Sequence, residues 1–142
     1  MSTMYLKGLE VALDALMQEA AAPSGTLKAR FMSTSYTPNA GTHQFWSDIS
    51  SDAASGFSDI TLTSVDVRID AANGRVEVDY DNLTEASVTG STDKYVVRLD
   101  TGTDSTSPLI VCKDIVEGTL SPLSGTITIT INAEGDFAVS AT

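Results

Sequence analysis

The chain has 142 residues and a formal net charge of −11, from 19 acidic and 8 basic side chains. An apolar content of 42% with 19% charged residues is typical of a globular protein and excludes a disordered one. The length suits one domain over residues 1–142, and the acidic surface makes nucleic acid an unfavourable direct partner, because it repels phosphate.

Residues 2–21 predict an N-terminal helix. Ser2 or Thr3 can supply its N-cap, and Pro23 and Gly25 end it. A lone helix is marginal in water, so its apolar stripe must be covered by the chain's own sheet or by another subunit. The stripe repeats every three or four positions and consists of Leu6, Leu9, Leu13, Leu16, Met17 and Ala20.

The start of the chain and its apolar runs also bear on targeting. A basic region followed by an apolar core is missing at the N-terminus, so we expect no signal peptide. Apolar runs fall short of the roughly 18 residues that a membrane span needs. We therefore expect assembly in a cytoplasm and no membrane partner.

Residues 27–32 predict the first strand, with alternating apolar and basic side chains. Residues 33–59 then predict a long loop, whose stretch 35–50 holds the only Trp and the only His. We expect an ordered loop across the β-fold, with an exposed tip at residues 38–42. Its aromatic side chains either fold inward or form an exposed platform for a sugar or a partner protein. We expect the inward arrangement for Tyr36, Phe45 and Trp46.

From Ile60 onward the sequence alternates between strands and turns. Asn73 and Gly74 suit a hairpin turn, because both tolerate positive φ. With no helix between strands, the pattern predicts an all-β fold: an antiparallel β-sandwich of about seven or eight strands over residues 27–140, after one short N-terminal helix. The expected strands cover residues 60–62, 65–69, 75–80, 83–89, 94–100, 109–116, 125–131 and 136–140.

The sequence offers few candidate catalytic or metal-binding residues. Ser35 or Ser47 with His43 and Asp48 could form a triad, but no nucleophile elbow accompanies them. A single His excludes a His-paired metal site within one chain, and Cys112, in an apolar run, predicts a small buried hydrophobe. The acid-rich stretches 79–82 and 100–104 lack the spacing of a calcium loop and predict turns. We therefore expect no enzyme activity, no cofactor and no metal.

Several motifs occur together in this chain. Residues 35–39 read Ser-Tyr-Thr-Pro-Asn, residues 42–45 Thr-His-Gln-Phe and residues 47–49 Ser-Asp-Ile, with a Ser-Gly pair at 55–56. This set resembles a family of small tailed-phage virion structural proteins, some of them capsid decoration or cement proteins. Residues 100–110 and 125–137 resemble later parts of the same family. The chain departs from it in a shortened loop at 57–59 and in lacking a Trp at 83–89.

The resemblance implies a capsid cement or decoration protein on the head exterior of a virion. Its expected partners are the major capsid protein and copies of itself, with a trimer favoured. Residues 1–47 sum to zero charge and are expected to face protein, whereas residues 48–142 carry the whole −11. The alternatives are a tail-associated adaptor or receptor- or glycan-binding module, and an accessory hydrolase. The candidate protein-contact residues are Leu6, Leu9, Leu13, Tyr36, Pro38, His43 and Trp46.

Overall fold

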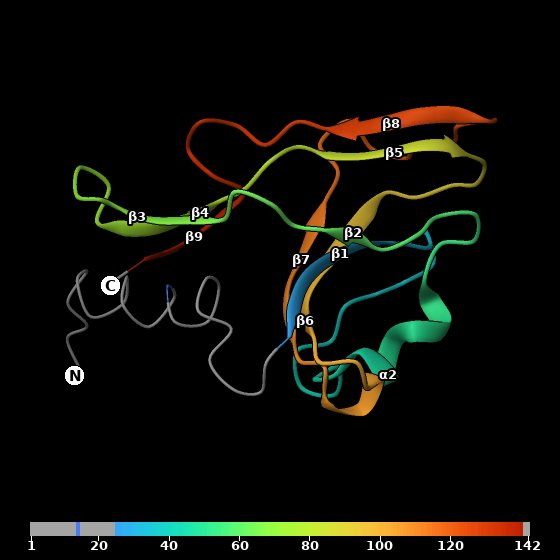
Figure 1. Ribbon diagram of the computed structural model, residues 1–142, viewed down its shortest axis with the longest axis horizontal. Coiled ribbons are helices and arrows are strands. Elements are labelled where there is room, and N and C mark those ends of the chain that lie inside the picture. Colours follow the sequence, from blue (N-terminus) through green and yellow to red (C-terminus); the bar gives the residue numbers. More distant parts are fainter. Residues whose placement is uncertain (1–13, 15–24, 141–142) are drawn as a thin grey trace. The chain divides into compact units, whose positions relative to one another are not determined.

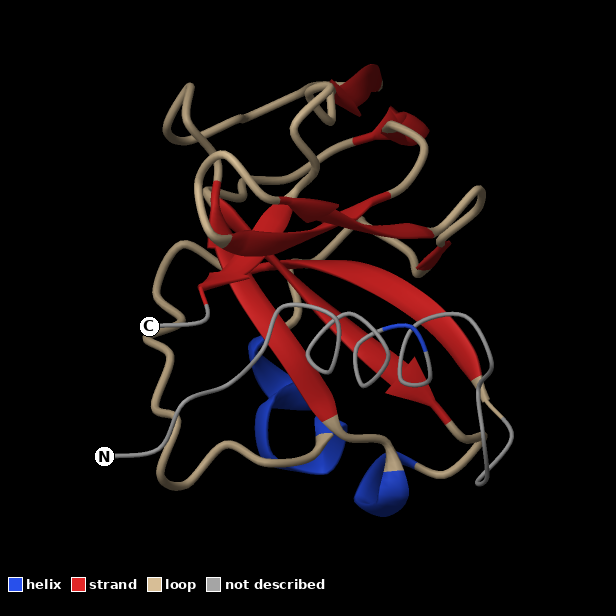
Figure 2. Cartoon of the chain, turned by 90° about the vertical axis from the view of Figure 1, so that its left-hand side faces the viewer, coloured by secondary structure: helices blue, strands red, loops and turns tan. Residues whose placement is uncertain are grey.

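The structure, a computed structural model, describes residue 14 and residues 25–140. The described residues form paired antiparallel strands with a few short helical turns, which confirms the expected all-β, sandwich-like fold (Figure 2). The predicted helix at 2–21 lies outside the described residues apart from Asp14, which is helical. The elements are β1 (Thr26–Met32), α2 (Trp46–Ile49), η1 (Ser50–Asp52), β2 (Ile60–Thr61), β3 (Asp66–Asp70), β4 (Arg75–Asp79), β5 (Leu83–Val88), β6 (Lys94–Asp100), η2 (Asp104–Thr106), β7 (Leu109–Asp114), β8 (Gly125–Ile129) and β9 (Phe137–Ser140).

The described chain divides into two compact units (Figure 1). The larger unit comprises Gly25–Thr61 and Leu83–Ile129. It contains a four-stranded sheet in the order β2-β1-β6-β7 and a two-stranded sheet of β5 and β8. The smaller unit comprises Leu62–Asn82 and residues 130–140, and it contains the three-stranded sheet β3-β4-β9.

The core of the larger unit lies on both faces of β6. A strand that is covered on both faces has a nearly continuous run of apolar residues. In β6 the consecutive residues Tyr95, Val96 and Val97 are all buried. On one face, the Phe31 ring lies 5.3 Å from that of Phe57 and 6.2 Å from that of Tyr95, between centroids. On the other face a second apolar cluster joins Met32, Tyr36, Trp46, Ile49 and Val96.

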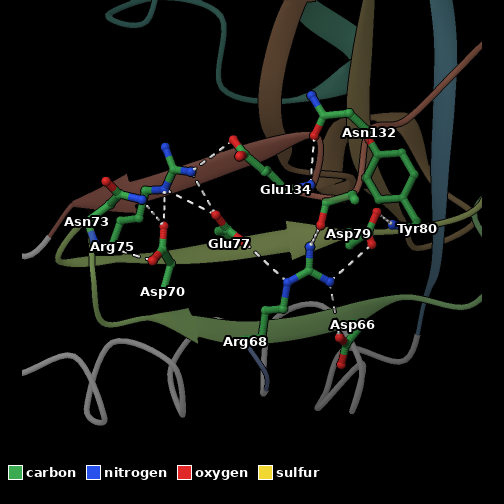
Figure 3. Close-up of polar contacts among 11 residues, drawn as sticks. Asp66, Arg68, Asp70, Asn73, Arg75, Glu77, Asp79, Tyr80, Asn132 and Glu134 are labelled. Carbon is green, nitrogen blue, oxygen red and sulfur yellow. Dashed lines mark hydrogen bonds and ion pairs between the residues drawn. The ribbon is translucent and has the colours of Figure 1, made fainter.

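The smaller unit is built on the predicted hairpin. β3 and β4 pair from Asp66↔Asp79 to Asp70↔Arg75, and Gly74 in the turn has φ +63°, as its sequence predicts. The buried Glu77 carboxylate accepts from Arg68 Nε at 3.1 Å and from Arg75 Nη2 at 2.8 Å (Figure 3). Two guanidinium groups thus satisfy one buried charge, which is what such a charge requires.

Candidate functional site

The aromatic loop is pinned to the start of β7 by backbone hydrogen bonds. Trp46 N donates to Ser107 O at 2.9 Å, and Leu109 N donates to Gln44 O at 3.0 Å. The Asp48 carboxylate accepts from the backbone N–H groups of Phe45 and Gln44, both at 2.9 Å, and these bonds lower the pKa of Asp48. The expectation of an ordered loop is therefore confirmed. The short helical segment α2–η1 was not predicted, because a single turn is too short to show helical periodicity.

The aromatic side chains of the loop divide into buried and exposed. Tyr36 and Trp46 are buried, as predicted, and residues 38–42 are exposed, as predicted. The prediction for Phe45 is wrong, since 40% of it is exposed. Phe45 has an extended backbone immediately before the first helical residue, so its side chain and that of Trp46 leave the chain in different directions, and Trp46 takes the inward one.

A charged cluster, which we call the Asp59 cluster, supports Trp46. Arg98 is 3% exposed, and its Cζ lies 4.1 Å from the centroid of the Trp46 ring, a cation–π arrangement. Its Nη1 and Nη2 donate to the two carboxylate oxygens of Asp59 at 3.2 and 2.7 Å. Lys28 Nζ and Arg30 Nη1 lie 3.9 and 3.7 Å from the same carboxylate. The Asp59 carboxylate therefore lies within 4 Å of three cations on β1 and β6, and Lys28 also pairs with Asp100 at 2.5 Å.

A pocket of about 230 Å³ lies between the loop and β7. None of its lining side chains is Asp, Glu, Lys or Arg, although the chain as a whole is strongly acidic. The lining residues are Tyr36, Pro38, Asn39, Ala40, His43, Gln44, Val96, Leu109, Ile110, Val111 and Cys112.

Polar groups that line the pocket form hydrogen bonds and a ring stack with one another. The rings of Tyr36 and His43 stack with centroids 5.6 Å apart, and Tyr36 OH lies 3.2 Å from His43 Nδ1. The backbone N–H of Asn39 also donates to Nδ1 at 3.2 Å, which fits an imidazole protonated on Nε2. Burial raises the pKa of the Tyr36 hydroxyl, so it stays a neutral donor.

The predicted contact residues are partly brought together. Tyr36, Pro38 and His43 line the pocket, and Trp46 packs with Tyr36 in the adjoining apolar cluster. Leu6, Leu9 and Leu13 lie outside the described residues. The β7 side chains in the lining were missed, because an apolar run such as 109–112 is indistinguishable from core by sequence alone.

The other residues considered for catalysis or metal binding have structural roles among the described residues. Ser35 Oγ bonds Ser33 Oγ, while His43 and Asp48 bond the partners given above, so these groups of the considered triad do not bond one another. Asp81 accepts from the hydroxyls of Thr63 and Ser64, and Asp100 pairs with Lys28 at 2.5 Å. No group of three His, Cys, Asp or Glu in the part of the chain that the structure describes could hold a metal ion.

Comparison with known proteins found no family model, no curated protein and no solved structure that matches this chain. Among residues 14 and 25–140, no helix is both long and apolar enough to cross a bilayer. The loop, the pocket and the sequence motifs that form them are therefore the features that bear on function.

Cys112 is expected to react slowly with thiol reagents. Burial, followed by the nearby Asp114 carboxylate, raises its pKa to about 11, against an ordinary value of 9.0. Because the thiolate is the reactive species, a pKa higher by about two units lowers the labelling rate near pH 7.5 by about 100-fold relative to the unfolded chain. Labelling with and without urea, followed by mass spectrometry, measures this ratio, and equal rates would contradict the half-buried placement of the thiol.

Trp46 is expected to be shielded from solvent in the free protein. It is the only Trp, so tryptophan fluorescence reports on it alone, and it is 7% exposed. Acrylamide is the suitable quencher, because a chain of charge −11 repels iodide. We expect several-fold weaker quenching in buffer than in urea. Equal quenching in the two conditions would show that the loop is not folded inward.

Proposed function

We propose that this protein is a capsid decoration or cement protein of a tailed phage, bound to the head exterior through the major capsid protein and its own copies. The observation that carries the proposal is the motif set at residues 35–56, which resembles that family. Support comes from how the motif folds: it forms a pinned surface segment around a pocket. Residues 33–47 contain no Asp, Glu, Lys or Arg.

The distribution of charge supports a protein-binding role for this segment. A surface without formal charges loses less hydration free energy on docking than a charged surface does. Charged residues are likewise depleted at the centres of protein interfaces. The acidic remainder of the chain keeps the protein soluble and disfavours nucleic acid. The proposed protein is therefore structural, and it needs neither an active site nor a cofactor.

The test uses virions with the gene intact and with the gene deleted. We expect the protein on intact virions in many copies, and we expect purified protein to bind deleted heads and restore their resistance to heat. Pro38→Glu, on the exposed tip, is expected to weaken this binding, whereas the matched Thr119→Glu, in an exposed loop outside the motif, leaves it unchanged. Virions that lack the protein although its gene is intact would overturn the proposal.

A second candidate is a tail-associated adaptor or a receptor- or glycan-binding module. The observation that favours it is the exposed Phe45, which follows Gln44 of the pocket lining in the chain, together with the amide and imidazole groups of that lining. Stacking on a sugar needs exposed aromatic rings, and the burial of Tyr36 and Trp46 leaves Phe45 as the exposed ring of these three. Antibody labelling of virions separates the candidates, because the label falls on the head in one case and on the tail in the other.

A further inference from the structure

We propose that the outer edge of β7, with the pocket beside it, binds an extended peptide as an added strand. The bound peptide places one large apolar or aromatic side chain in the pocket and has basic residues at both ends. This inference concerns how a partner is held, and it does not depend on capsid decoration.

The backbone of β7 has an outer edge that no other described strand pairs with. β7 is the last strand in the order β2-β1-β6-β7. Ile115 N donates to Asp93 O at 2.8 Å, toward β6. Along an antiparallel strand, successive residues direct their backbone N–H and C=O groups to opposite sides. The backbone groups of Lys113 and Val111 therefore also bond toward β6. Those of Cys112 and Asp114 point outward. Within the described residues no strand pairs with these outward groups, and such an edge is a template for strand addition.

The part of this edge that no described strand or loop covers fits one short segment. The start of β7 is already occupied, because Leu109 N bonds Gln44 O and Phe45 forms a bridge with Pro108. The edge that remains, residues 110–114, extends about 17 Å at 3.4 Å per residue. A complete second β7 would collide with the loop at residues 44–45, so a single extended peptide fits better than a second copy.

The pocket provides the side-chain site. Val96 and Cys112 are cross-strand partners whose side chains line it on one face of the sheet, and Tyr36 and His43 line it from the loop. Side chains of an added strand alternate between faces, so every second residue points to this face. The volume of about 230 Å³ exceeds the roughly 150 Å³ apolar cavity that binds benzene. It therefore accommodates a ring the size of that of Phe.

The charges around the pocket determine which residues are favoured at the ends of the bound peptide. The pocket has no formal charge, but carboxylates lie at both ends of β7. Asp114 is its last residue, Glu117 lies three residues further on, and Asp104 precedes its start. All three are exposed, and no ion pair between described residues uses them. The uncharged pocket between these carboxylates complements a peptide with an apolar centre and Lys or Arg at each end, while Lys113 belongs to the alternate face of β7 from Cys112.

The test uses the full chain, labelled with ¹⁵N, and a set of nonapeptides. The peptides carry Phe, Leu or Ser at the centre, Thr and Val at the other positions, and either Lys or Glu at both ends. We expect the Phe-centred, Lys-ended peptide to slow hydrogen exchange at the Cys112 and Asp114 amides by about tenfold or more. The Glu-ended peptide is expected to bind about tenfold more weakly at low salt.

Two matched pairs establish the mode of binding. A single N-methyl group on a peptide amide that faces β7 is expected to abolish binding, while the same group moved by one residue leaves it intact. Ala40→Trp, on the exposed tip, is expected to fill the pocket and abolish binding, whereas Thr42→Trp, exposed but outside the lining, does not.

Three results would overturn the proposal. The first is that no peptide of the set protects the two amides. The second is that binding is equal for both N-methyl positions, which would exclude strand addition. The third is concentration-dependent protection of these amides without peptide, which would show that a second copy occupies the edge.

Discussion

Gly56→Ala is expected to lower the free energy of unfolding by about 3 kcal/mol, because two separate costs add. Gly56 has φ +85°, where an L side chain is strained, and an added Cβ would lie 2.0 Å from the carbonyl oxygen of Thr89. Gly90 approaches from the other side, since its Cβ would lie 2.4 Å from Ser55 O. The two backbone segments are therefore in direct contact, and neither has room for a methyl group.

Gly102→Ala is the matched control in the same unit. Its φ of +84° is nearly the same, but no atom lies within 4 Å of the added Cβ. We expect a loss of about 1 kcal/mol, from backbone strain alone. Urea unfolding followed by circular dichroism measures both variants. Equal losses of unfolding free energy in the two variants would show that the Thr89 carbonyl moves aside without cost. The close contact would then not contribute to the effect of Gly56→Ala.

Asp59→Ala is expected to destabilise the protein by about 3 kcal/mol, since it leaves cations without their carboxylate. Arg98 is affected most, because it is 3% exposed and its ion pair among the described residues is with Asp59, through two hydrogen bonds. Lys28 retains Asp100, at 2.5 Å. The Trp46 ring cannot by itself compensate a buried guanidinium, because a cation–π contact contributes only about 2 kcal/mol when desolvated.

Two further variants separate this effect from the loss of a negative charge. Asp104→Ala removes an exposed carboxylate in the same unit and is expected to change stability by no more than about 0.5 kcal/mol. Adding Arg98→Met to Asp59→Ala removes the stranded charge, so the double variant is expected to recover about 1–3 kcal/mol relative to the sum of the single variants. Additive effects would contradict a direct pairing of the two residues.

Much of the strand pattern could be predicted, because it depends on local alternation. β1 and β6 begin and end within one residue of their predicted bounds, and the hairpin at Asn73 and Gly74 forms as expected. The alternation of Lys28 and Arg30 with apolar neighbours also predicts correctly which β1 side chains share a face. The prediction that Phe45 is buried failed, because the direction of its side chain depends on the backbone conformation of a single residue.

The site itself could be predicted only in part. The motif residues Tyr36, Pro38 and His43 were identified as contact candidates, and all three line the pocket. The opposite wall, from β7, was not identified, because nothing in the run at 109–112 indicates that it lies at the edge of a sheet. Strand order decides this, and strand order depends on pairing between segments far apart in the chain.

The amino-acid sequence alone determined the all-β class, most of the strands, the hairpin turn and the absence of charged side chains from residues 33–47. These properties follow from neighbouring residues, whose alternation and turn preferences act locally. Only the tertiary structure decided that Arg98 is buried and which aromatic side chains are covered. Arg98 is stable inside because Asp59, 39 residues away, lies against it, and such a partner cannot be found by local pattern.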